Sequence, residues 1–155
     1  MHSTFNSWTM AGRSFLRPSL AAGGRYRFEF MVESKPGRMY YFIGAAPCSK
    51  DPSSPPFDPM ASQLEIRRRS AAVENLYGGL HEVGRPSMSK GLPCFHAGSK
   101  VAVEFDLLSW TMRVDGLVDG QTRTCKLRPA PEGYACFVSL YNRGAAFRIV
   151  RAEQA

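Results

Sequence analysis

The densest group of chemically active side chains in this sequence is the run Arg67-Arg68-Arg69-Ser70. Guanidinium groups bind carboxylates and phosphates through paired, charge-assisted hydrogen bonds, so the run predicts contact with an anion. An acidic protein surface or the phosphates of RNA would fit it. Ser70 is a candidate for phosphorylation, which would add negative charge and weaken anion binding. The plainer alternative is a solvated sheet edge whose charges prevent pairing with another sheet.

Cysteine and histidine residues give little indication of a metal site. The cysteines are Cys48, Cys94, Cys125 and Cys136, and no two of them have the Cys-x-x-Cys spacing. In Cys94-Phe95-His96 a cysteine and a histidine lie close together, but no second pair completes the four ligands of a structural zinc ion. We therefore expect no metal and no cofactor, and free thiols in an intracellular protein.

Catalytic patterns are equally weak. The sequence contains no Gly-x-Ser-x-Gly, His-Glu-x-x-His, P-loop or Gly-x-Gly-x-x-Gly motif. The histidines, at positions 2, 81 and 96, are scattered, and His81 beside Glu82 is interpreted as an exposed strand end. Glu29 and Glu104 are acids that a glycosidase-type pair would use, but the sequence does not fix the distance between them. We expect the protein not to be an enzyme.

The composition indicates one basic globular domain. The chain has 155 residues, a formal net charge of +7 and a pI near 9.5, and 15 of its 20 cationic residues are arginine. A chain of this length buries enough surface to fold without disulfides. The positive charge is compatible with RNA or an acidic protein as a partner and requires neither. No run of 18 or more apolar residues is present to span a membrane.

Alternating apolar and polar residues predict the strands that must position any site. In residues 23–33 every second position from Tyr26 to Val32 is apolar. Successive side chains of a strand point to opposite faces, so one face of this strand is apolar and the other is wet. Residues 39–46 and 134–141 are apolar almost throughout, which is typical of strands buried on both faces.

Residues 98–116 predict a half-buried hairpin. Apolar and charged residues alternate over 100–107, Leu108-Ser109 form the turn, and the alternation resumes over 110–114. Asp115-Gly116 then supplies a pair that tolerates the positive φ of a second turn.

The remaining segments add short strands and loops. Further strands are expected at residues 63–69 (an exposed edge), 71–77, 122–127 and 145–150. Residues 48–59 are rich in proline and form a loop, and residues 84–91 are expected to be irregular. About ten to twelve short strands without a helical period predict an all-β fold, a sandwich of two antiparallel sheets with few or no helices.

Three of these segments resemble, in the same order, the signature of SPRY (B30.2-like) domains. The first has the residues Gly24, Tyr26, Phe28-Glu29, Tyr41 and Ile43-Gly44-Ala45. The second is 98–116, with Asp106-Leu107 before the turn. The family usually has Gly-Asp and Asn-Gly where this chain has Gly98-Ser99 and Asp115-Gly116. The third is the late apolar strand 134–141, which contains Ser-Leu.

The resemblance implies a bent, concanavalin A-like sandwich over residues 13–151. It leaves residues 1–12 as an N-terminal segment, expected to form a strand packed on the domain, and 152–155 as a C-terminal tail. We expect an intracellular protein, cytoplasmic or nuclear. The first 28 residues contain arginines and no acid, and this leaves import into an organelle as an alternative.

The resemblance also implies a function in protein interaction, without catalysis. SPRY domains bind peptide segments or protein surfaces through loops at one rim of the sandwich. The candidate loops are 47–60, 74–85, 117–122 and 141–144. We expect a protein or peptide partner, no contact with a membrane, and a place as a subunit or adaptor of a larger complex, with the oligomeric state left open.

Aromatic and arginine side chains provide most of the binding energy of protein interfaces. The side chains expected to bind the partner are therefore Tyr77, Arg85, Tyr141, Asn142 and Arg143. The alternative function is contact with RNA or another nucleic acid through the basic surface. The side chains expected to serve it are Arg67, Arg68 and Arg69.

Overall fold

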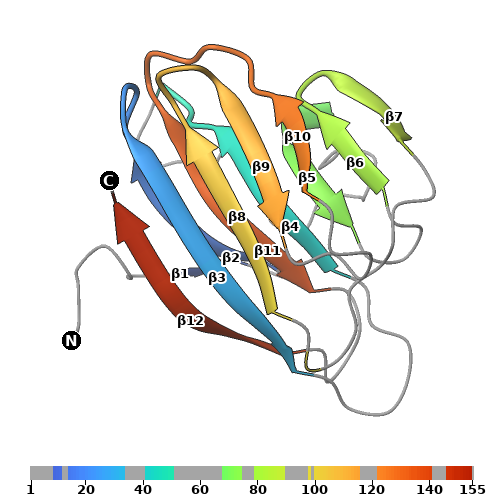
Figure 1. The fold of residues 1–155 in the computed structure, drawn as a ribbon. Coiled ribbons are helices and arrows are strands. Elements are labelled where there is room, and N and C mark those ends of the chain that lie inside the picture. The colour runs from blue at the N-terminus through green and yellow to red at the C-terminus, as the bar shows by residue number, and fades with distance from the viewer. Residues whose placement is uncertain are drawn as a thin grey trace.

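A computed structural model describes residues 9–11, 14–33, 41–50, 68–74, 79–89, 98, 100–115, 122–140 and 146–154. In these residues the chain forms two antiparallel sheets that face each other (Figure 1). Of the residues described, Arg68 and Arg69 alone are helical. The all-β sandwich predicted from the sequence is confirmed.

Seven strands form one sheet and five form the other. The seven-stranded sheet has the order β1 (Thr9–Ala11), β2 (Ser14–Leu20), β11 (Tyr134–Leu140), β4 (Tyr41–Pro47), β5 (Ala71–Glu74), β6 (Gly79–Glu82) and β7 (Arg85–Ser89). The five-stranded sheet has the order β10 (Arg123–Lys126), β9 (Thr111–Asp115), β8 (Lys100–Asp106), β3 (Arg25–Glu33) and β12 (Ala146–Gln154).

The main core lies between the two sheets and is rich in aromatic rings. The predicted alternation in β3 and β8 turns Phe28 and Phe105 inward, and both side chains are fully buried. Their ring centroids are 6.3 Å apart, and Phe28 pairs across the strands with Val103. Burial of such rings supplies much of the hydrophobic stabilisation of a domain.

The strands β4 and β11 of the seven-stranded sheet are buried on both faces, as their continuous apolar runs predicted. Ile43 and Val138 belong to the core between the sheets. Phe42 and Phe137 point to the opposite, outer face and are nevertheless fully buried. One cross-strand row of this outer face runs through Phe137, Gly44, Ala72 and His81.

The prediction that His81 is exposed is wrong. Its side chain is only 1% exposed because it lies on the buried outer face of the seven-stranded sheet, beside Ala72. The imidazole packs edge-on against the ring of Phe42, and its Nε2 lies 3.4 Å from the hydroxyl of Ser70. Ser70 is also fully buried. A kinase therefore cannot reach this hydroxyl in the folded protein, and the hypothesis of phosphorylation at Ser70 is withdrawn.

Other local differences concern the ends and edges of strands. Residues 85–89, expected to be irregular, form β7. Proline is compatible with a strand there because β7 is the outer strand of its sheet, where one side of the backbone needs no donor. Asp115 is the last residue of β9, and Gly116, the second residue of the predicted turn, lies outside the described residues. The β12 strand continues to Gln154, with a register shift that leaves Val150 exposed.

Candidate functional site

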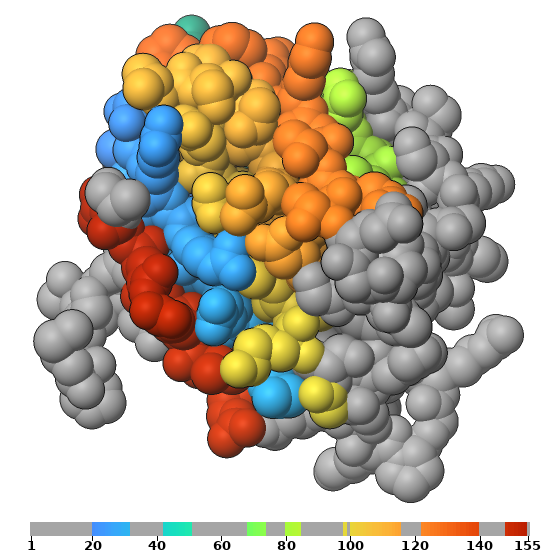
Figure 2. Space-filling view, viewed as in Figure 1, coloured from blue at the N-terminus to red at the C-terminus, as the bar shows by residue number. Residues whose placement is uncertain are grey.

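Three connecting segments meet at one end of the sandwich, at the top of Figure 1, and we call this end the upper end. They are the β2–β3 turn (21–24), the β8–β9 turn (107–110) and the β10–β11 loop (127–133), which together we call the upper rim. The amide of Gly23 donates to the Leu107 carbonyl at 2.8 Å, and the Leu107 amide donates to Gly24 at 2.9 Å. Figure 2 shows these segments meeting along the upper edge of the molecule, in blue, gold and orange.

Further hydrogen bonds fix the β10–β11 loop to this end. The Leu127 amide donates to the Trp110 carbonyl at 2.8 Å, and the hydroxyl of Tyr134 donates to the Arg128 carbonyl at 2.5 Å. Burial raises the pKa of Tyr134 to about 12, so this hydroxyl keeps its proton at physiological pH. The upper rim is thus a rigid surface built from segments that are far apart in the sequence.

The β8–β9 turn has four residues where the sequence predicted two. Leu107 to Trp110 connect the strands, and Asp106 Oδ1 accepts hydrogen bonds from the amides of Leu108 and Ser109, at 3.0 Å each. The bond from the Ser109 amide, with that from Leu108 and the nearby charge of Arg25, lowers the pKa of Asp106. Leu108 is 67% exposed at the tip of this turn.

An arginine-rich corner lies at the same end. Arg68 and Arg69 are exposed, and the Arg68 carbonyl accepts a hydrogen bond from the Gly84 amide at 3.1 Å. Gly84 belongs to the β6–β7 turn, which is followed by Arg85 at the start of β7. The structure thus brings the backbone of Arg85 close to the basic run that was predicted separately from it.

The other predicted site residues, which are Arg67, Tyr77, Tyr141, Asn142 and Arg143, lie outside the described residues. The strand ends that flank the last four can be placed. Glu74 pairs with Phe42, and Leu140 pairs with Tyr41, so both lie at the lower end of the seven-stranded sheet. Arg85 begins its strand at the upper end. The predicted contacts therefore derive from segments that adjoin two different ends.

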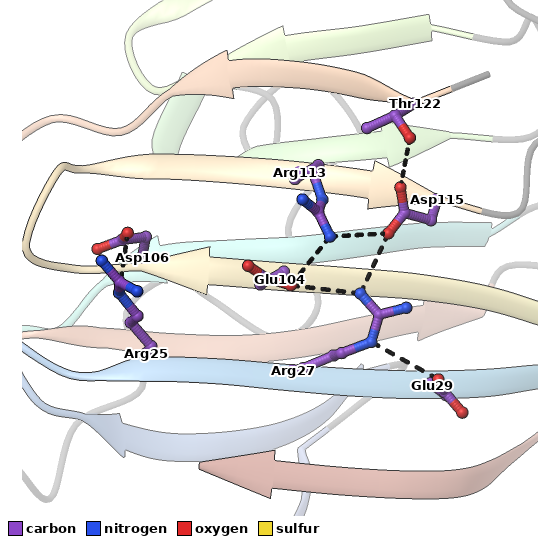
Figure 3. A network of polar contacts seen from close by, with 8 residues as sticks. All are labelled: Arg25, Arg27, Glu29, Glu104, Asp106, Arg113, Asp115 and Thr122. Atoms are coloured by element: carbon purple, nitrogen blue, oxygen red, sulfur yellow. Dashed lines mark hydrogen bonds and ion pairs between the residues drawn. The ribbon is translucent and has the colours of Figure 1, made fainter. Parts of the chain in front are cut away.

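A network of charges covers the outer face of the five-stranded sheet (Figure 3). Arg27 on β3 contacts Glu104 on β8 at 3.3 Å and Asp115 on β9 at 3.1 Å. Arg113 contacts the same two carboxylates, at 3.2 and 3.4 Å. Ala102 on β8, whose side chain is small, lies between β3 and β9 and leaves room for Arg27 to reach across a whole strand.

The two acids considered for a glycosidase-type pair both belong to this network. Arg27 contacts Glu29 at 3.6 Å and Glu104 at 3.3 Å. The guanidinium of Arg27 thus lies between the two carboxylates and holds both of them in ion pairs. The arrangement therefore favours a structural role for both acids.

Asp115 makes the network sensitive to acid. Burial alone would raise its pKa, but hydrogen bonds from Thr122, at 2.6 Å, and from Arg27, together with the arginine charges, lower it. A carboxyl with a lowered folded-state pKa stabilises the fold above its unfolded pKa, which is about 3.9, and loses this effect as the pH falls through the folded-state value. We expect Asp115→Asn to cost about 1 kcal/mol at pH 7.

The same substitution should flatten the loss of stability below about pH 4, because one proton fewer is taken up on unfolding there. Urea denaturation of both proteins at pH 7, 4 and 3 measures this. If the stabilities of the wild type and of Asp115→Asn fall in parallel over this pH range, the pKa of Asp115 is not lowered in the folded protein.

Three of the four cysteines lie in the part of the chain that the structure describes. Cys48, Cys125 and Cys136 are not in disulfide bonds, and burial, with a smaller effect of the Glu82 charge, raises the pKa of Cys125 to about 12. Within the described ranges no three histidine, cysteine, aspartate or glutamate side chains are grouped as metal ligands would be. Among the same residues, no helix has the length and hydrophobicity needed to cross a membrane.

Sequence reasoning missed the upper rim. Leu108 and Ser109 were recognised as a turn, but residues 21–24 and 127–133 were not considered as binding loops. One signal was available, since Leu107-Leu108 places two apolar residues together in an otherwise alternating hairpin. In such a pair one side chain has to leave the core face.

No protein-family model matches the sequence, and a search of curated proteins finds no match. Solved structures share its fold. The SPRY domain of human HERC1 is 9% identical, with a TM-score of 0.56, and the match covers 96% of this chain and 86% of that one. Toad ovary galectin bound to thio-digalactose is 14% identical (TM-score 0.51, covering 95% and 100%), and lectin UEA-II bound to galactose is 13% identical (0.52, covering 96% and 84%). The SPRY-like, concanavalin-type sandwich expected from the sequence is confirmed.

Proposed function

We propose that this protein is a non-catalytic interaction module that binds a peptide segment or a protein surface through loops at an end of its sandwich. It acts as a subunit or adaptor of a larger complex. The observation that carries the proposal is the upper rim, in which backbone hydrogen bonds join three loops and leave their outer side chains exposed. The SPRY-like fold supports the same conclusion.

Rigid loops suit recognition because little conformational entropy is lost when a partner binds them. The sandwich supplies the rigidity, since both sheets are anchored in a core of fully buried aromatic rings. The chemistry of the exposed residues then decides which partner is bound.

Two sets of residues are proposed as contacts. The upper set is Arg68, Arg69 and Arg85. The lower set is Tyr77, Tyr141, Asn142 and Arg143. Arginine and tyrosine form many of the strongest contacts at protein interfaces, and each truncation to alanine at such a position costs on the order of 2 kcal/mol of binding free energy.

Affinity purification from native cells tests the proposal. The bait proteins are the wild type, Arg68→Ala with Arg69→Ala, Tyr141→Ala with Arg143→Ala, and Lys100→Ala as an exposed control on β8. We expect at least one protein partner that is retained by the control and lost with one of the double variants. Failure of both double variants to release any partner would rule out the proposed contacts.

A second candidate function, contact with RNA, is supported by the exposed Arg68–Arg69 pair and the net charge of +7. Binding driven by six to ten phosphate contacts would lose about 10³- to 10⁵-fold in affinity between 50 and 200 mM salt. An RNA affinity with this steep dependence, abolished by Arg68→Ala with Arg69→Ala, would favour the RNA function over the protein one.

A further inference from the structure

Leu108 is the most exposed large apolar residue of the part of the chain that the structure describes. Its side chain is 67% exposed, whereas the preceding Leu107 is 1% exposed and belongs to the core. An exposed leucine does not gain the favourable free energy of transferring its side chain from water to an apolar environment. Single exposed apolar residues are nevertheless common on proteins, so the surroundings of Leu108 decide whether it has a role.

The turn that carries Leu108 is held in one conformation. Asp106 Oδ1 binds the amides of Leu108 and Ser109, and the Trp110 carbonyl binds the Leu127 amide. Trp110 has a φ of 60°, a left-handed conformation that bulky residues rarely adopt. Strain of this kind persists where the surrounding structure enforces it, and it is concentrated at binding and active sites. The position of Leu108 is therefore fixed before a partner arrives.

Small and rigid residues surround this turn. Ala21 and Ala22 in the β2–β3 turn and Pro129 and Pro131 in the β10–β11 loop are exposed. Both segments are hydrogen-bonded to the β8–β9 turn. These side chains are short, and alanine and proline lose almost no side-chain entropy when a partner covers them. The result is an apolar surface of short side chains, from which the longer side chain of Leu108 projects.

Positive charge borders this apolar surface. The charged residues of the upper rim and the adjoining strand ends are Arg25, Asp106, Lys126, Arg128 and Glu132. Arg25 is ion-paired with Asp106 at 3.2 Å, which leaves Lys126 and Arg128 against one acid, Glu132. Such a border attracts an acidic partner and repels a basic one. The apolar centre favours a protein segment over nucleic acid, because a phosphate backbone has no apolar side chain to place against Leu108.

We propose that the upper rim binds an acidic protein segment, with Leu108 packed against an apolar side chain of that segment and Arg128 contacting its carboxylates. This inference rests on the proposed function and names the partner chemistry and the anchor residue. It places the main contact on the β8–β9 turn, outside both sets of residues proposed above.

A displayed library of random 12-residue peptides, selected on the immobilised full chain, tests the inference. We expect enrichment of peptides in which an apolar residue is flanked by aspartate or glutamate. The affinity of a synthetic peptide with the enriched sequence is then measured by calorimetry. We expect Leu108→Ser and Arg128→Glu each to weaken binding at least tenfold. Val150→Ser, a matched change at the other exposed apolar residue, 43% exposed on β12, should leave it unchanged.

Leu108→Ser removes an exposed side chain, so its denaturation curve should match that of the wild type and exclude a folding defect. Enriched peptides that are basic, or whose binding survives Leu108→Ser, would overturn the inference. If such peptides are instead lost with Tyr141→Ala and Arg143→Ala, the proposed function stands and only the assignment to the upper rim fails. Absence of any enriched peptide overturns the inference too, and the proposed function then depends on the affinity purification.

Discussion

Replacing Gly44 by alanine is expected to prevent folding, or to lower the free energy of unfolding by about 4 kcal/mol or more, a loss reached only by severe core defects. A Cβ atom at this position would lie 2.0 Å from the Ala71 carbonyl oxygen and 2.6 Å from the Ala72 Cα. Both are backbone atoms of β5, so no side-chain rotation can relieve the overlap. The central strands β4 and β5 would have to separate and lose ladder hydrogen bonds.

Gly23→Ala is the matched control. Gly23 has a φ of +87°, but a Cβ atom there would meet nothing within 4 Å. Its replacement costs only the strain of a left-handed alanine, about 1 to 2 kcal/mol. Chemical denaturation followed by circular dichroism measures both variants. Equal losses for the two proteins would show that β4 and β5 do not approach as closely as the structure requires.

The fold was predictable because the pattern of apolar and polar residues in these strands indicates which of their faces are buried. The alternation of β3 and β8 predicted one apolar face each, and the continuous runs of β4 and β11 predicted burial on both faces. In each case the residues that define the pattern are neighbours in the chain. Strand periodicity is a local signal, so it can be recognised without knowing which strands pair with one another.

Errors occurred where burial depends on distant neighbours. His81 and Ser70 look like surface residues next to charged ones in the sequence. His81 is buried because its row continues through Ala72 and Gly44 to Phe137, on a face that is covered, and the buried Ser70 lies against it. Buried polar groups are generally hydrogen-bonded, and the Ser70 hydroxyl provides a partner for Nε2 of His81, at 3.4 Å.

The site was harder to predict than the fold for the same reason. The sequence indicates candidate contacts only by residue type within single loops, and most of these residues lie outside the described ranges. The upper rim exists only because residues 21–24, 107–110 and 127–133 are hydrogen-bonded to one another across three turns. No local pattern in any one of these segments indicates the other two.

Phe137→Ala is expected to cost about 3 to 5 kcal/mol, as large as truncation of a ring between the sheets. Phe137 is fully buried, yet it points away from the core that the two sheets share. We expect this large loss in the free energy of unfolding because the ring of Phe137 fills the space beside Gly44. Gly44 has no side chain of its own to fill that space. Truncation would open a cavity there that the close approach of β4 and β5 prevents from collapsing.

Met31→Ala provides the comparison on the outer face of the other sheet. Met31 is partly exposed there, so its truncation should cost at most about 1 kcal/mol. Urea denaturation gives both free energies, and binding of a hydrophobic dye to the native proteins reports opened apolar surface. A loss below about 1 kcal/mol for Phe137→Ala would mean that the outer face of the seven-stranded sheet is open to water. The buried environment assigned to His81 and Ser70 would then fail as well, because both side chains lie on that face.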